Sequence, residues 1–79
     1  MVVWSEPVIL LSAHKHGISE GDILHAWRNA IDVWEQDDDM TMLIGPDPSA
    51  RLLEVGVVDS DQGPVIVHCM IARRKYLRR

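Results

Sequence analysis

Side chains suited to phosphate chemistry are concentrated at the C-terminal end of the chain. Five of its eight Lys and Arg residues lie in the last seven positions: Arg73, Arg74, Lys75, Arg78 and Arg79. Residues 1–72 hold the other three cations against all 12 Asp and Glu residues, so this part carries −9 and the last seven carry +5. A concentrated positive end can hold an anion that the net charge of −4 would repel. The alternative is a solvated, frayed terminus.

Two histidines could supply acid–base chemistry beside these cations. His16 follows Lys15, and an unperturbed imidazole titrates near neutral pH, as a general acid or base requires. The alternative for His16 and Lys15 is a position in the last turn of a helix, where cations are favoured. His68 precedes the basic end and could face a phosphate-binding groove there or be a packed, hydrogen-bonded histidine. Tyr76 could stack on a base or pack a terminal turn.

No metal or cofactor is expected. No Cys or His pair has zinc spacing, and histidines two apart on a helix, such as His14 and His16, point to different sides. The Asp run at 37–39 lacks the ligand pattern and glycine of a calcium loop and is more typical of a hairpin tip. The chain has no phosphate-binding glycine loop and no nucleophile motif. Its one cysteine, Cys69, is interpreted as a small buried hydrophobe without chemistry.

Length and composition indicate a single globular domain over residues 1–79. The chain is 47% hydrophobic and 25% charged, which is typical of a folded protein. No apolar run approaches the roughly 18 residues of a membrane span, and the N-terminus lacks the basic segment of a signal peptide. We therefore expect a cytoplasmic protein without membrane contact.

Helix signals occur twice in the first 30 residues. Ser5 as cap and Pro7 in a first turn predict a helix over 6–15, with an inward face centred on Leu11, ended by a left-handed Gly17. Ser19 as cap predicts a second helix over 20–29, whose apolar stripe includes Ile23, Trp27 and Ile31.

After Ala30 the hydrophobic period changes to two, which is typical of strands. Strands are predicted at 31–35, 40–44, 51–58 and 64–71, with pairing ended by two prolines and a glycine at 45–49. Leu53, Val55 and Val57 should face the helices, and His68 should share a face with Ile66 and Met70. Sequential strands with short connections pair antiparallel by default. The predicted fold is α+β: two N-terminal helices packed on a four-stranded antiparallel sheet, with a short basic C-terminal turn or tail.

Several short segments resemble a known family in order and spacing. They are Trp4, the Lys-His-Gly-Ile-Ser run at 15–19, Ile44-Gly45 before Arg51-Leu52-Leu53, and Ile71-Ala72-Arg73. Over most of its length the chain resembles the BrnT-type toxins of bacterial type II toxin-antitoxin systems. The resemblance implies a RelE-like fold, a metal-independent ribonuclease that cuts mRNA, and neutralisation by a DNA-binding antitoxin.

The resemblance also assigns Arg51 and Arg73 as phosphate-binding candidates; the alternative for both is a surface ion pair. The candidate catalytic residues are then His16, His68 and Arg73. The candidate RNA-binding residues are Lys15, Arg51, Arg74, Lys75 and Tyr76.

Departures from the family pattern support a second function, and the tryptophans suggest a third. The family usually has Asp where this chain has Ser5, Lys where it has Val8, and often Arg where it has Met40. Loss of two basic groups would suit a non-catalytic protein-binding module that retains the toxin fold. The three tryptophans, Trp34 above all, could instead lie at the interface of a homodimer.

Overall fold

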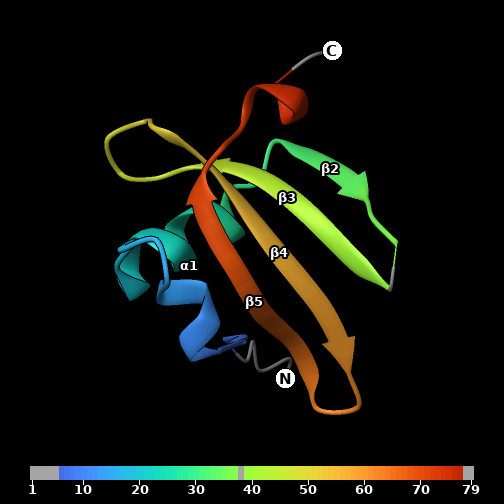
Figure 1. Ribbon diagram of the computed structural model, residues 1–79. Coiled ribbons are helices and arrows are strands. Elements are labelled where there is room, and N and C mark those ends of the chain that lie inside the picture. Colours follow the sequence, from blue (N-terminus) through green and yellow to red (C-terminus); the bar gives the residue numbers. More distant parts are fainter. Residues whose placement is uncertain (1–5, 38, 78–79) are drawn as a thin grey trace, which may run out of the picture.

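A five-stranded mixed sheet with the order β1-β5-β4-β3-β2 forms the centre of the molecule (Figure 1). The computed structural model describes residues 6–37 and 39–77. Strand β1 runs parallel to β5, whereas the other neighbours are antiparallel. The strands are β1 (Val8–Ile9), β2 (Asp32–Glu35), β3 (Met40–Pro46), β4 (Leu52–Ser60) and β5 (Gly63–Ile71).

The described chain contains one α-helix, α1 (Glu20–Arg28), and two 3-10 helices, η1 (Leu11–His14) and η2 (Arg74–Tyr76). The predicted fold of two helices on a four-stranded antiparallel sheet is therefore wrong. The element order instead places a strand and a 3-10 helix before α1, and a basic 3-10 turn at the C-terminal end.

The predicted helix over 6–15 is replaced by β1 and η1. The β-branched pair Val8–Ile9 aligns with Val65–Ile66 of β5, and the Leu10 N–H continues the pairing by donating to the Ile66 carbonyl. Pairing to an existing strand outweighs weak local helix signals, because helix propensity is only a weak prior. Leu11, the expected centre of an inward face, is 90% exposed. The proposed Ser5 cap lies outside the described residues.

The second predicted helix is confirmed nearly to the residue. The Asp22 N–H donates to the Ser19 hydroxyl at 3.2 Å, as expected of an N-cap. Ile23 is buried and Trp27 packs against the core, but Ile31 lies beyond the helix and is exposed. Gly17, with φ of +79°, has the expected left-handed conformation.

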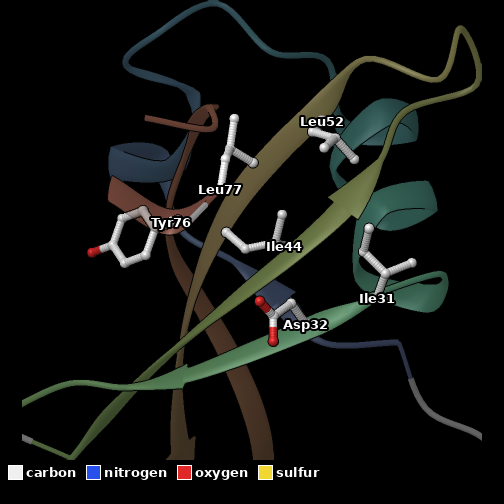
Figure 2. Close-up of a pocket in the computed structure, with 6 residues that line it drawn as sticks. All are labelled: Ile31, Asp32, Ile44, Leu52, Tyr76 and Leu77. Carbon is white, nitrogen blue, oxygen red and sulfur yellow. The ribbon is translucent and has the colours of Figure 1, made fainter. Parts of the chain in front are cut away.

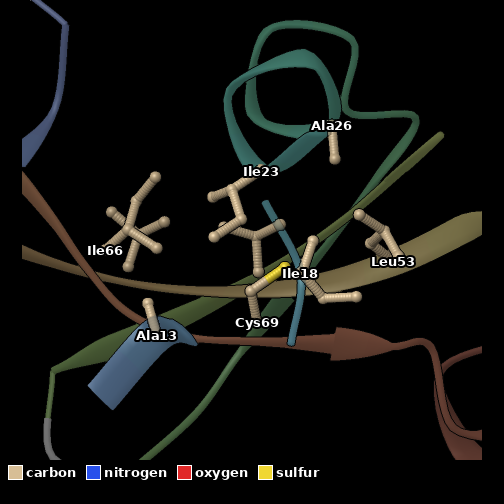
Figure 3. Close-up of a cluster of buried hydrophobic side chains, with 9 residues drawn as sticks. Ala13, Ile18, Ile23, Ala26, Leu53, Ile66 and Cys69 are labelled. Carbon is tan, nitrogen blue, oxygen red and sulfur yellow. The ribbon is translucent and has the colours of Figure 1, made fainter. Parts of the chain in front are cut away.

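Helix α1 and η1 cover one face of the sheet and bury the main core there (Figure 3). Leu53, Val55 and Val57 of β4 face this core, as predicted. The core consists of these three side chains with Ala13, Ile18, Ile23, Ala26, Ile66 and Cys69. Burial raises the pKa of the Cys69 thiol to about 12, with a further contribution from the Glu54 charge. A thiol this hard to deprotonate is inert at neutral pH.

A β-bulge on β5 changes which side chains share a face. Gly56 pairs with His68 but Val57 pairs with Ile66, so Val67 is an extra residue without a partner. The Ser12 hydroxyl donates to the Val67 carbonyl at 2.7 Å. Ile66 therefore packs in the helix-side core, and the prediction that His68 shares its face is wrong. His68 lies instead on the opposite face, which we call the open face.

The C-terminal turn folds back onto the open face. Tyr76 of η2 packs with Met42 and Ile44 of β3, and Trp34, Met40, Leu52 and Ala72 surround them. Pairing of β3 continues to Pro46, against the prediction that it ends at 44. Pro46 is tolerated because β2 does not extend this far: the first residue of β2, Asp32, pairs with Ile44. The N–H that Pro46 lacks therefore has no partner on β2, and no hydrogen bond of the sheet is lost.

Close packing of α1 against β3 makes Gly45 a specific test of this fold. A Cβ at Gly45 would collide with the Ala26 carbonyl oxygen and approach Ala30 Cα to 3.1 Å. We expect Gly45→Ala to lower the free energy of unfolding by about 1–3 kcal/mol, as overpacking does. Urea denaturation checks this value. Gly21→Ala is the control, since its Cβ meets open space and Ala favours a helix; equal stability of the two variants would contradict the packing.

Candidate functional site

Glu54 is a fully buried carboxylate near the start of β4, on the open face of the sheet. Its Oε1 accepts from the backbone N–H of Arg73 at 2.8 Å, and its Oε2 accepts from Arg73 Nη2 at 2.8 Å. Arg73 Nε lies 3.1 Å and 3.2 Å from the two oxygens. His68 Nε2 lies 2.9 Å from Oε2. These bonds replace the water that a buried carboxylate loses.

The bonds to Arg73 and His68 keep Glu54 ionised. Desolvation raises the pKa of Glu54, but hydrogen bonds from the side chain and backbone of Arg73, and then from His68, outweigh it and hold that pKa below its ordinary value. The same carboxylate raises the pKa of Arg73. The cluster is thus an ion pair with a histidine attached.

The ionised carboxylate fixes the orientation of the His68 imidazole. A carboxylate can only accept hydrogen bonds, so His68 Nε2 must carry a proton and donate it. In the neutral ring the nitrogen that can accept a proton is then Nδ1. The His16 ring meets the His68 ring edge-on, with centroids 5.8 Å apart. Two imidazoles that lie this close can act as an acid–base pair.

The structure therefore brings His16 next to His68 and Arg73, which lie more than 50 residues further along the chain, so the three predicted catalytic residues come together. The expectation that His68 is hydrogen-bonded is also met, but its partner is a charged group. We call these three residues and Glu54 the Glu54 cluster. Lys75 Nζ lies 5.0 Å and the Arg73 guanidinium carbon 5.7 Å from the centre of the Tyr76 ring, so both cations contact this aromatic ring.

Tyr76 does not offer a ring face to a base. It is 4% exposed, contacts Trp34 edge-on at 5.8 Å, and donates from its hydroxyl to Gln36 Oε1 at 3.2 Å. The prediction of base stacking is wrong, and the alternative of packing a terminal turn is correct. Trp34, the residue suggested for a homodimer interface, makes this edge-on contact with Tyr76 within the chain.

Of the other predicted RNA-binding residues, Lys15 and Arg74 adjoin members of the Glu54 cluster in sequence, and Arg51 shares a pocket with one of them. Lys15 and Arg74 are exposed, and within the described part of the chain neither side chain forms an ion pair. Arg51 lines a pocket of about 340 Å³ together with His16. Arg78 and Arg79 lie outside the described residues.

Arg51 and Arg73 do form ion pairs, as the alternative reading expected, but their partners are buried. Arg51 Nε donates to Asp47 Oδ2 at 2.9 Å, and Asp47 is 4% exposed. Desolvation raises the pKa of Asp47, yet hydrogen bonds from the backbone and side chain of Arg51 and from the Ser49 backbone hold it below its ordinary value. Both arginines are therefore held in place by carboxylates that have lost their water.

Sequence reasoning missed Glu54 and Asp47. Glu54 alternates with the core residues of β4, so the pattern places it only on the face turned away from the helices and does not predict its burial. The available signal was a lone carboxylate within the apolar run 52–58. Its burial depends on the C-terminal turn, which folds back from about 20 residues away and has no local signature.

A second pocket, of about 430 Å³, lies between β2, β3 and the C-terminal turn (Figure 2). Five of its six lining residues are aliphatic or aromatic, and the sixth is Asp32, which lies on β2 in this view. The Asp32 carboxylate accepts from the Val33 N–H and from Trp34 Nε1. With a carboxylate and apolar walls, this pocket is unsuited to a phosphate. Its lining residues are Ile31, Asp32, Ile44, Leu52, Tyr76 and Leu77.

The remaining histidines are engaged by the backbone. His14 Nδ1 lies 3.0 Å from the Ile18 carbonyl, and His25 Nδ1 lies 2.7 Å from the Pro46 carbonyl. Within residues 6–37 and 39–77, no group of three or more His, Cys, Asp or Glu side chains could hold a metal ion. Among the same residues no helix has the length and apolar character to cross a membrane.

Comparisons with protein-family models, curated proteins and solved structures find no match for this chain. The resemblance to BrnT-type toxins therefore stays a prediction from short motifs. The function has to be argued from the geometry of the Glu54 cluster.

The acid stability of the protein should depend on Glu54. Its pKa in the folded state lies below the ordinary value of 4.5, so the ion pair stabilises the fold fully above about pH 4.5 and is lost as the pH falls through the folded-state pKa. We expect Glu54→Gln to cost about 1–3 kcal/mol at pH 7, because Arg73, which is 47% exposed, loses the charge of its buried partner. The difference from the wild type should shrink as the pH falls below 4.5. Urea denaturation across this range measures both effects.

Glu35→Gln is the matched control, since Glu35 is an exposed carboxylate on β2. It should leave the pH dependence of the unfolding free energy unchanged. A Glu54→Gln protein that tracks the wild type at every pH would contradict the account of the cluster.

Proposed function

We propose that the protein is a toxin-type, metal-independent ribonuclease that cuts mRNA at the Glu54 cluster. This proposal is supported mainly by the edge-on contact of the His16 and His68 rings, whose centroids lie 5.8 Å apart. Glu54 orients the His68 ring and binds Arg73. Cleavage by the neighbouring 2′-hydroxyl needs three things: a base, an acid, and a cation near the phosphate.

Each group in the cluster suits one of these roles. His68 Nδ1 would accept the proton of the 2′-hydroxyl as its oxygen bonds to phosphorus. Protonated His16, which is exposed, would give its proton to the 5′-oxygen as the phosphorus–oxygen bond breaks. The products are a 2′,3′-cyclic phosphate and a 5′-hydroxyl, so no water or metal is consumed in this step.

Arg73 would stabilise the charge that develops on the phosphate. Glu54 engages its Nε and Nη2, which leaves Nη1 as the donor for substrate. The side chain is 47% exposed and can be reached from solvent. Arg74 and Lys75 follow Arg73 directly in the sequence and would add positive charge to attract the RNA backbone.

As a toxin, such a protein would be neutralised by a DNA-binding antitoxin. Ile31 and Leu77, which are exposed and line the pocket of Figure 2, would offer such a partner an apolar surface. This partner is part of the proposal and follows from the resemblance.

A non-catalytic protein-binding module is the second candidate. It is favoured by Met40, which stands where the family often has Arg and packs against the apolar cluster under the C-terminal turn. Val8, where the family has Lys, lies on the edge strand β1 opposite Val65. A binding module would retain its partner after loss of His16, whereas a nuclease would lose its toxicity.

The proposal is tested by incubating the purified protein with mRNA in the presence of a chelator. Cleavage products ending in a 2′,3′-cyclic phosphate are expected, and His16→Ala should slow cleavage by roughly 100-fold or more, the contribution of one general acid. His16 is exposed, so its removal should leave the unfolding free energy nearly unchanged.

His25→Gln is the control, because His25 contacts the Pro46 carbonyl and lies outside the cluster. Its cleavage rate should match that of the wild type. A wild-type protein that neither cuts mRNA nor arrests growth on expression would refute the nuclease, and so would full activity in His16→Ala.

A further inference from the structure

A row of apolar side chains crosses the open face of the sheet. Val8 pairs with Val65 on β5, and Val65 pairs with Val58 on β4. Val58 in turn pairs with Met40 on β3. Residues directly opposite each other on paired strands share a face, and Val58 lies four residues from Glu54 on β4, so the row lies on the open face. We call these four residues the valine row.

The valine row keeps contact with solvent. Val8 is 55% exposed, and the other three side chains are half-buried. Met40 borders the apolar cluster that contains Tyr76, so the row continues the surface on which the C-terminal turn packs. A partly exposed apolar row across a sheet is suited to packing against a second surface.

The C-terminal turn and the hairpins lie at opposite ends of the strands. Strand β4 begins where the Leu52 carbonyl accepts from the Ala72 N–H, and it ends at the hairpin where Ser60 pairs with Gly63. The β2–β3 hairpin lies at this same end, because β3 begins opposite the last part of β4. Figure 1 shows η2 at one end of the sheet and the β4–β5 hairpin at the other.

These two ends carry opposite charge. The C-terminal turn carries three exposed cations, Arg73, Arg74 and Lys75. The hairpin end carries five exposed carboxylates, which are Glu35, Asp37, Asp39, Asp59 and Asp61. Within residues 6–37 and 39–77, none of these five carboxylates forms an ion pair. The molecule is therefore a dipole along the direction of its strands, and each end attracts the opposite end of another copy.

We propose that two copies of this chain form a symmetric dimer through their open faces, in which the C-terminal turn of each copy covers the valine row of the other. The basic turn of one copy then lies beside the acidic hairpins of the second copy. Leu77, which is 48% exposed, adds an apolar side chain to the turn. The interface is self-complementary, so each of its contacts occurs twice.

Charge determines how the two copies are oriented. Two facing sheets can be related by a two-fold axis that runs along the strands or across them. An axis along the strands would oppose the two basic turns and the two acidic ends, which costs free energy. An axis across the strands reverses one copy, so each basic turn meets an acidic end. The same axis places each turn over the valine row of the other copy, because turn and row lie towards opposite ends of the open face.

Such a dimer closes the Glu54 cluster to RNA. His68 pairs with Gly56, and Met70 pairs with Glu54, so the cluster lies on the open face between the valine row and the C-terminal turn. A second copy that contacts both the row and the turn covers what lies between them. This consequence rests on the proposed function: cleavage per chain should fall as the protein concentration rises above the Kd of the dimer.

Sedimentation equilibrium of the purified chain, without RNA, tests the dimer. A reversible dimer with a Kd of about 100 µM or tighter is expected at about 50 mM salt. The Kd should rise by about tenfold at about 500 mM salt, because salt screens the attraction between opposite ends. Non-specific association of chains with a net charge of −4 would instead be strengthened by salt.

Variants of the valine row test the surface. Val58→Lys should weaken the dimer by about tenfold or more, as loss of a central contact does. Val58→Thr keeps the branched shape that strands favour and serves as the second variant should Val58→Lys not fold; it should weaken the dimer by about threefold. Leu11→Lys is the control, because Leu11 is 90% exposed and lies outside the row, and it should leave the Kd within about twofold of the wild type.

Charge-swapped variants test the orientation. One variant carries Arg74→Glu with Lys75→Glu, and the other carries Asp37→Lys with Asp61→Lys, one change in each hairpin. Each variant alone opposes like charges twice in its dimer, so its association should weaken by about tenfold or more. An equimolar mixture should regain the wild-type affinity, because both contacts of the mixed dimer then join opposite charges.

A chain that stays monomeric up to about 500 µM would overturn the dimer. Equal weakening by Leu11→Lys and Val58→Lys would overturn the surface, and a charge-swapped mixture that does not associate would overturn the orientation. A dimer with all these properties in a protein that leaves mRNA intact would refute the nuclease and leave the interface standing. Cleavage by a chain that never dimerises would do the reverse, and cleavage per chain that is equal above and below the Kd would overturn the closure of the site.

Discussion

A carboxylate without access to water is the constraint on which the open face of this protein depends. Glu54 is fully buried in β4, and the residues on either side of it, Leu53 and Val55, belong to the helix-side core. A buried charge of this kind is costly unless it is paired and hydrogen-bonded. Arg73 and His68 satisfy it, so the requirement of one residue determines the positions of two others.

The C-terminal turn follows from the same constraint. The backbone N–H of Arg73 donates to Glu54, which ties the chain to the sheet just before η2 begins. Tyr76 can then pack with Met42 and Ile44, and its hydroxyl reaches Gln36. A basic segment that would otherwise be solvated is held against the sheet, beside two histidines. In this way charge, packing and the candidate chemistry share one set of contacts.

How much could be predicted from the sequence depended on the range of the interactions involved. Helix α1 was predictable because its signals are local, namely the Ser19 cap and the stripe with Ile23. The alternation of Leu53, Val55 and Val57 likewise shows the face that packs on the helix.

The rest depends on contacts between distant parts of the chain. Val8–Ile9 forms a strand because β5 offers it a partner, which no local pattern shows. The bulge at Val67 separates Ile66 from His68, and Glu54 is buried by a turn that is remote in sequence. Of the site, the residue types His16, His68 and Arg73 were predictable, but the group that joins them was not.

The central claim is that Glu54 determines the proton position on His68, and long-range ¹H–¹⁵N correlation of the imidazole nitrogens tests it most directly. At alkaline pH, where the ring is neutral, the account predicts a proton on Nε2 and a bare Nδ1, as the 2.9 Å contact with Glu54 requires. The His16 ring, which has no such partner among the described residues, should interchange its two tautomers. A His68 ring protonated on Nδ1, or one that interchanges as freely as His16, would contradict the account.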